Sequence, residues 1–395
     1  MTYPAILIAS AILLLTFGVE RLGRASGILA VIMLIAIGLA AKPLLAFFGL
    51  TLDGLDLVVP VIGAIGLVLI VLEGALDIEL RRSRLKAAAG AFAMAASGFL
   101  VVSAALTGLV LLTLPLAPLE AMLLAVPFAV ISSAVAIPSS GFLPQRAREF
   151  VVYESSLSDI LGVLVFFALL NSDGTAAGVL LGLIGGGALS LLLALVFAVG
   201  LVLVLMRVDG HIRFIPLLAG LFGLYAAGKL LHLSPLILVL LFGLALNNPS
   251  LITRFRPFRG WMDDTYEATL GEFKVLVMEL TFAVRGFFFI LLGYWTDPAE
   301  LASPWAWLAA AVVLVVVFGS RRIMLRLGRV PLGEALTWIA PRGLITVLLF
   351  LGAREALPMP AFAGGAVMLV VLVSSAVIAL ARLKAGGTAA AHTPP

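Results

Sequence analysis

Two apolar stretches of the chain are interrupted in the same way. Residues 131–141 read ISSAVAIPSSG, and residues 337–346 read TWIAPRGLIT. Proline removes a backbone hydrogen-bond donor and clashes with the preceding helical turn, so each stretch predicts a broken helix. Irregular backbone at membrane depth is tolerated only where it is packed in protein or lines a water-filled cavity. The alternative interpretation is a simple kink or helix end at each proline.

The composition around these breaks is that of an integral membrane protein. Of the 395 residues, 63% are hydrophobic and 12% are charged, whereas a soluble domain is about 45–50% apolar and about 25% charged. The mean hydropathy is +1.23. A soluble globular enzyme is therefore excluded. With no Cys and three His, thiol catalysis and a His-rich metal site are not expected, and no cofactor is predicted.

Apolar runs separated by charged or turn residues predict an all-α polytopic protein with 13 transmembrane helices, since a span needs about 20 apolar residues. The stretch 248–272 is interpreted as a cytoplasmic linker with an interfacial helix. The predicted spans lie near 3–19, 25–41, 57–76, 87–114, 119–138, 151–171, 177–206, 214–232, 235–247, 273–295, 303–320, 333–353 and 360–381.

Positive charges alternate with this numbering of the spans. Of the 25 Lys and Arg residues, 20 fall in loops after odd-numbered spans, while only Lys42, Lys229 and Arg354 fall after even-numbered spans. Cytoplasmic loops carry the excess of positive charge. We therefore expect a multi-pass protein of the cell membrane, with its N-terminus outside and its C-terminus in the cytoplasm.

Carboxylates lie inside the sixth span. Residues 152–162 read VYESSLSDILG, and at about 100° per residue Ser155 and Asp159 lie about 40° apart on one face, with Glu154 about 140° from Asp159. Ionisable residues within spans are costly and are functional candidates by default. The alternative for Glu154 is a long loop that leaves it in water.

The two broken spans are the fifth and the twelfth, so they run in opposite directions through the membrane. This predicts an inverted repeat, with spans 1–6 mirrored by spans 8–13 and span 7 as connector. Crossed broken helices place free carbonyls and half-helix ends near the bilayer midplane. Asp159, on the following helix, is expected to face the crossing, and the combination predicts an ion site.

Three arginines within or next to spans need partners, because a guanidinium does not deprotonate in a protein. Glu154 is the predicted partner of Arg321 or Arg322, with a plain cytoplasmic positive cluster as the alternative for both. Arg285 is interpreted as part of a structural pair between helices, and Glu279 is a local alternative partner.

Five short motifs resemble one known family. They are LEGALDIELR at 72–81, SSAVAIP at 132–138, ESSLSD at 154–159, FFFILLG at 287–293 and PRG at 341–343. The chain resembles the monovalent cation:proton antiporters of the sodium/proton exchanger superfamily, of NhaP-like type.

The resemblance implies an elevator-type antiporter that forms a homodimer. It implies one membrane domain at 1–384, and the small and polar residues 385–395 predict a disordered cytoplasmic tail. Within that domain it implies a core bundle at about 87–171 and 303–382, a scaffold and dimerisation bundle at about 3–76 and 214–295, and a linking helix at about 177–206.

The resemblance also implies site residues. Asp159 would bind the alkali cation, with help from the Ser155 hydroxyl and the Ser132 carbonyl, and Glu154 would pair with an Arg on the eleventh span. Ser158 stands where relatives carry Asn or Asp. The full predicted site comprises the ion-binding residues Asp159, Ser155, Ser132, Glu154 and Ser158, the ion-pairing residues Glu154, Arg321, Arg322 and Arg285, and the broken-helix residues Ser133, Pro138, Pro341, Arg342 and Gly343.

These residues suggest a mechanism. Burial raises the pKa of a carboxyl group and a nearby cation lowers it, so Asp159 is predicted to hold either one proton or one alkali cation. With a single titrating acid and an Arg that keeps its charge, we expect 1:1 electroneutral exchange of a cation, Na⁺ before K⁺ or Li⁺, for H⁺.

Two other functions are open at this point. A sodium-coupled symporter of a small organic anion could share the fold but would need a roomy polar cavity. An intramembrane hydrolase would need a second deep Asp or an H-E-x-x-H motif, and the sequence has neither within the spans. The predicted partners are the cation, the proton, the bilayer and a second copy, with no nucleic acid and no nucleotide-binding domain.

Overall fold

The computed structural model describes most of the chain as helices. The described residues are 2–26, 29–47, 55–77, 85–172, 214–230, 235–248, 264–330 and 333–390, with single residues and pairs between 174 and 200. Over these ranges there is no strand. The helices are α1 (Thr2–Ser26), α2 (Ala30–Phe47), α3 (Leu55–Leu76), α4 (Leu85–Thr113), α5 (Pro118–Ala129), α6 (Ser133–Ser139), the 3₁₀-helix η1 (Ser140–Phe142), α7 (Gln145–Leu170), α10 (Phe214–Leu230), α11 (Pro235–Asn247), α13 (Asp264–Trp295), α14 (Pro298–Ala302), α15 (Pro304–Leu327), α16 (Gly333–Thr337), α17 (Leu344–Ala356) and α18 (Ala363–Ala390).

Eight helical stretches among the described residues are long and apolar enough to cross a membrane, and three shorter apolar helices accompany them. The predicted twelfth span, 333–353, corresponds to the short helices α16 and α17. The predicted span 177–206 lies almost entirely outside the described residues. The all-helical multi-pass architecture is therefore confirmed, whereas the number of 13 spans stays a prediction.

Large apolar side chains cover the outer faces of several of these helices. Leu14 of α1, Leu112 of α4 and Val315 of α15 are each more than 70% exposed. Such side chains have no favourable place in water, and a helix that exposes them is suited to lipid. The exposed apolar faces therefore agree with a membrane location.

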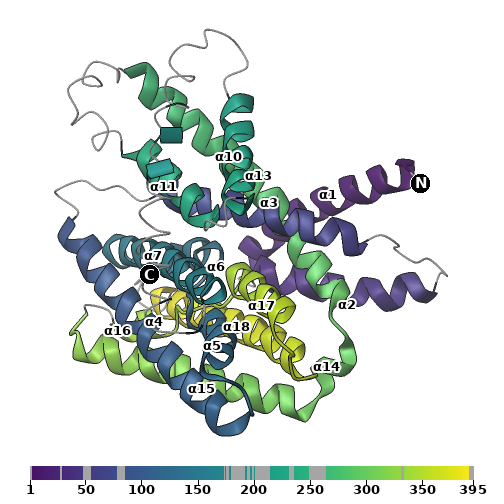
Figure 1. Ribbon diagram of the computed structural model, residues 1–395, viewed down its shortest axis with the longest axis vertical. Helices are drawn as coiled ribbons and strands as arrows, with labels where there is room; N and C mark the ends of the chain where they lie inside the picture. The colour runs from purple at the N-terminus through teal and green to yellow at the C-terminus, as the bar shows by residue number, and fades with distance from the viewer. Residues whose placement is uncertain are drawn as a thin grey trace.

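The helices pack as two bundles, which Figure 1 shows in the lower part of the view and in the upper and right-hand parts. We use the name core bundle for α4–α7 with α14–α18, and the name scaffold bundle for α1–α3 with α10, α11 and α13. Within each bundle the helices pack extensively, for example α4 against α5 and α7, or α13 against α2 and α3. Fewer helices meet across the boundary, where α3 and α11 face α7.

A close crossing of α2 and α13 joins two helices of the scaffold. A Cβ atom at Gly38 would collide with the carbonyl of Ile290, and one at Gly293 would collide with the carbonyl of Ile35. Small residues let helix backbones approach closely in membranes, where packing drives association. The two glycines therefore hold the scaffold together at this crossing.

Both predicted interruptions are present, but the first lies at a different place. Its extended residues are Val130–Ser132, between α5 and α6, and Pro138 lies inside α6 and does not cause the break. The backbone leaves the helix earlier because hydrogen-bond partners from other segments take up its N–H groups. The second interruption runs from the end of α16 to Gly343, as Pro341 predicts.

Two segments predicted outside the spans form helix in the structure. Residues 264–272, expected in a linker with an interfacial helix, form the start of α13 and continue directly into the span. Residues 249–263 of that linker lie outside the described residues. Residues 385–390, expected in a disordered tail, continue α18 as far as Ala390. Extending an existing helix carries no nucleation cost, and alanines at 385, 389 and 390 offset part of the cost of Gly386 and Gly387.

Candidate functional site

The two interruptions cross in the centre of the core bundle. The Ser132 N–H donates a hydrogen bond to the Pro341 carbonyl over 2.9 Å. At Gly343 a Cβ atom would lie 2.6 Å from the Ser132 hydroxyl oxygen, a distance that no real side chain tolerates. Glycine at this position therefore allows the two unwound stretches to touch.

Arg342 satisfies carbonyl groups from both interrupted helices. Its Nε donates to the Phe128 carbonyl over 2.6 Å and its Nη1 donates to the Ala340 carbonyl over 3.0 Å. The last carbonyls of a helix lack helical partners and carry partial negative charge, so the guanidinium stabilises the end of α5. The Arg342 side chain is 1% exposed, and its own N–H donates to the Ser374 hydroxyl over 3.0 Å.

Asp159 of α7 lies beside this crossing. Its Oδ2 accepts a hydrogen bond from the Ser133 N–H, the first residue of α6, over 3.1 Å. Its Oδ1 is buried and has no hydrogen-bond partner among the described residues. The carboxyl group therefore has one oxygen tied to the broken helix and one oxygen available to a ligand.

Asp159 also lines a small cavity at the boundary with the scaffold bundle. The cavity is formed by Ile70, Val71 and Gly74 of α3 and Leu240 of α11, opposite Asp159 and its neighbours on α7. Among the residues that the structure describes, the scaffold side of this cavity carries no charged side chain. The carboxyl group thus lies at the boundary between the bundles and faces an apolar wall.

The serines near Asp159 have different surroundings. The Ser155 hydroxyl donates to the Val151 carbonyl of its own helix over 2.7 Å, which leaves its oxygen lone pairs free. The Ser132 hydroxyl is fully buried and has no partner in the described part of the chain. Ser158 instead accepts a hydrogen bond from the Ile131 N–H over 2.9 Å. Its oxygen therefore supports the unwound backbone.

Glu154 pairs with Arg321, and the structure leaves Arg322 exposed. The two nitrogens Nη1 and Nη2 of Arg321 bind Oε1 and Oε2 of Glu154 over 2.7 Å and 2.8 Å. The Arg321 Nε donates to the Leu336 carbonyl over 2.8 Å. Both side chains are at most 5% exposed. Because the pair is bidentate, both oxygens of Glu154 are occupied.

Arg285 of α13 reaches across the boundary between the bundles. Its Nη1 donates to the Ala134 carbonyl of α6 over 3.2 Å. One partner is therefore a backbone carbonyl of the core bundle, which the sequence did not reveal.

Several contacts at the site could not be found from the sequence. The backbone N–H groups of Ile131 and Ser133 carry no signal in the residue types. Ser156 and Thr346 also bury hydroxyls that lack partners among the described residues, and only their position in an apolar run sets them apart. Over the same residues no group of three or more His, Cys, Asp or Glu side chains could hold a metal ion.

Comparison with a protein-family model identifies the chain. The model described as "Sodium/hydrogen exchanger, transmembrane" matches residues 7–383. The chain belongs to the sodium/hydrogen exchanger family. Members of this family are transporters, so the exchanger is not an enzyme, and the predicted family is confirmed.

Solved structures give the same fold for the exchanger. The sodium proton antiporter MjNhaP1 from Methanocaldococcus jannaschii at pH 8 superimposes with a TM-score of 0.75, at 21% sequence identity over 97% of this chain and 99% of that one. An electron-microscopy map of the same antiporter gives a TM-score of 0.73 at 18% identity, over the full length of both chains. Comparison with curated protein sequences gave no match. Family and fold together support cation/proton antiport.

Proposed function

We propose that this exchanger moves one alkali cation, Na⁺, against one H⁺, with Asp159 as the shared site. The observation that carries the proposal is the buried Oδ1 of Asp159, which has no partner in the described residues, beside a crossing of two unwound helices. A buried charge without compensation is costly. Either a proton or a cation on this oxygen removes that cost.

The oxygens around Asp159 suit an alkali cation. Selective cation sites in membranes replace the hydration shell of the ion with protein oxygen atoms. Here Oδ1 of Asp159, the free lone pairs of Ser155 and the unpartnered hydroxyl of Ser132 are available for this. The Ser158 oxygen already accepts the Ile131 N–H, which favours a supporting role for Ser158.

The Glu154–Arg321 pair supports a 1:1 electroneutral exchange. Both oxygens of Glu154 are bound by a guanidinium that keeps its proton. Among the described residues of the site, Asp159 is then the acid left to exchange a proton for a cation. Each half-cycle would move a neutralised carboxyl group, so the membrane potential would not drive the exchange.

An elevator motion of the core against the scaffold accounts for alternating access. All the proposed cation ligands lie in the core bundle, and the wall that Asp159 faces is apolar. A neutral site can slide along Ile70, Val71 and Leu240, whereas the bare anion is held back by its desolvation cost. Crossed broken helices at the centre of the core favour the inverted repeat of this transporter class.

The proposal also covers the orientation in the membrane and the oligomeric state. The excess of Lys and Arg after odd-numbered spans favours a cytoplasmic C-terminus. We propose a homodimer, in keeping with the resemblance to the antiporters, and its test is the mass of the purified exchanger in detergent.

The decisive experiment is proton flux in proteoliposomes under an imposed Na⁺, K⁺ or Li⁺ gradient. Asp159→Asn is expected to abolish cation-dependent proton movement. Asp297→Asn is the matched control, because this exposed residue caps α14 and Asn caps a helix equally well. Retained exchange in Asp159→Asn would refute the proposal. Proton movement driven by membrane potential alone would refute electroneutrality, and a requirement for an organic anion would indicate the symporter.

A further inference from the structure

The helix α6 contains a carbonyl that its own sequence leaves free. In an α-helix the carbonyl of residue i accepts the N–H of residue i+4. The residue four positions after Ala134 is Pro138, which lies in the same helix and has no N–H. The Ala134 carbonyl therefore needs a donor from elsewhere.

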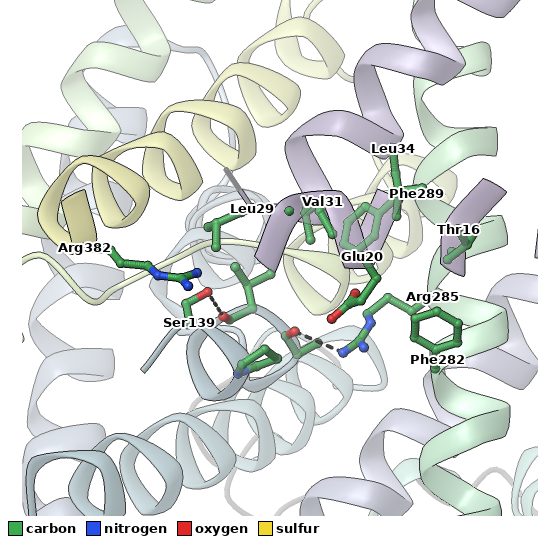
Figure 2. Close-up of a pocket in the computed structure, with 16 residues that line it drawn as sticks. Thr16, Glu20, Leu29, Val31, Leu34, Ser139, Phe282, Arg285, Phe289 and Arg382 are labelled. Carbon is green, nitrogen blue, oxygen red and sulfur yellow. Dashed lines mark hydrogen bonds between the residues drawn. The ribbon is translucent and has the colours of Figure 1, made fainter. Parts of the chain in front are cut away.

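That donor comes from the other bundle. Nη1 of Arg285, on α13 of the scaffold, donates to the Ala134 carbonyl over 3.2 Å. Figure 2 shows this bond inside a pocket that α1, α2 and α13 of the scaffold form with α6 and α18 of the core. One bond thus replaces the hydrogen bond that Pro138 removes and links the two bundles.

The Arg285 backbone is held firmly on the scaffold side. Next to it, a Cβ atom at Gly286 would collide with the side chain of Thr16 on α1, so the backbone of α13 packs directly against a side chain of α1. The Thr16 hydroxyl is itself bound to the Ile12 carbonyl over 2.8 Å. The guanidinium therefore projects from a packed helix pair.

The carbonyl side of the bond belongs to the ion site. Ala134 directly follows Ser133, whose N–H binds Oδ2 of Asp159 over 3.1 Å. Arg285 and Asp159 therefore bind adjacent residues of α6. A displacement of the core along the scaffold would carry Ala134 away from Arg285.

Charge within the pocket allows the bond to break. Glu20 of α1 lines the same pocket as Arg285, on the scaffold side. Because a carboxylate and a guanidinium share the pocket, neither charge has to be buried without an opposite charge nearby. The guanidinium can leave Ala134 and remain next to a carboxylate.

We propose that Arg285 is a positioning residue of transport, which stabilises the conformation described here through the Ala134 carbonyl that Pro138 leaves free. The proposal rests on the elevator motion under Proposed function. Arg285 does not touch the cation in it. It sets the balance between this conformation and the displaced one, and the bond breaks once in each cycle.

The test measures that balance directly. The exchanger has no Cys, so spin labels can be placed at Leu44→Cys on α2 and Leu112→Cys on α4, both exposed positions on opposite bundles. Double electron–electron resonance, with labelled protein diluted in unlabelled protein, gives the populations of the two conformations. Arg285→Met is expected to move the ratio about tenfold toward the displaced one, as for the loss of one charge-assisted hydrogen bond.

Pro138→Ala provides an independent variant. It restores the N–H that α6 lacks, so the Ala134 carbonyl no longer needs Arg285, and the ratio should move in the same direction. The double variant should move it no further than the single variants, because both remove the same bond. Arg322→Met, on an exposed position of α15, should leave the distances unchanged.

An unchanged distance distribution in Arg285→Met and Pro138→Ala would overturn the proposal, as would additive effects in the double variant. These distances are measured without transport, so the result is separate from the proposed function. A wild-type exchanger without cation-dependent proton flux would refute the proposed function, while the distances would still decide the role of Arg285.

Discussion

The two sides of the boundary at Asp159 differ in chemistry. The core side presents a carboxylate, several hydroxyls and the ends of interrupted helices, whereas the scaffold side presents Ile70, Val71 and Leu240. Every proposed ligand belongs to the core, and the scaffold contributes an apolar surface. In the proposed mechanism, the core would determine which ion is bound, and the scaffold would determine the conditions under which the bound site can move.

The largest expected effect comes from breaking the buried ion pair of the core. Arg321→Met leaves Glu154 as a buried charge without a partner and frees the Leu336 carbonyl. We expect a loss of about 3–5 kcal/mol in stability, measured by thermal unfolding in detergent.

The adjacent residue provides the control for this prediction. Arg322→Met replaces an exposed side chain and should change stability by no more than about 0.5 kcal/mol. Replacing both members of the pair, as Glu154→Leu with Arg321→Met, should recover much of the lost stability. Equal effects of Arg321→Met and Arg322→Met would show that the pair does not hold the core together.

A medium effect is expected from Ser158 in the same bundle. Ser158→Ala removes the acceptor of the Ile131 N–H, and an unsatisfied buried donor costs about 1–3 kcal/mol. Stability should fall by that amount, and Ser158→Thr should restore it because the hydroxyl returns. Ser97→Ala removes a hydroxyl bonded only within its own helix and should have little effect. If Ser158→Ala stays fully stable while cation affinity falls, the hydroxyl is a ligand and not a support.

The smallest expected effect concerns the apolar wall of the scaffold. Val71→Asn puts a polar amide opposite Asp159 and should make it easier for the bare carboxylate to pass. A barrier lowered by about 1 kcal/mol would speed proton leak without cation roughly fivefold, measured as pH decay in cation-free proteoliposomes. Leu100→Asn, on an exposed face of α4, should not change the leak. If Val71→Asn does not increase the proton leak, the apolar wall does not contribute to coupling.

The same division explains what the sequence could predict. The protein class, the family and one of the two helix breaks could be predicted from the sequence. The signals were the composition, the alternation of positive charge and the motifs around Asp159 and Pro341. These signals are local, since each depends on residue types within about one helix.

The remaining features depend on contacts between distant segments. The first break lies at Val130–Ser132 because Ser158, Pro341 and Asp159 bind its N–H groups, and no local pattern reveals such partners. The choice between Arg321 and Arg322 depends on which face of α15 turns inward. The hydrogen-bond partner of Arg285 across the boundary is a backbone carbonyl. Every residue possesses one, so no residue type could indicate it.

Arg342 has a mechanical consequence. One guanidinium donates hydrogen bonds to the Phe128 carbonyl at the end of one interrupted helix and to the Ala340 carbonyl in the other. Neither unwound stretch can therefore move without displacing the other. These two hydrogen bonds make the proposed ion site behave as one rigid unit. In the proposed elevator motion, the bound cation would then cross the bilayer without a rearrangement of its ligands.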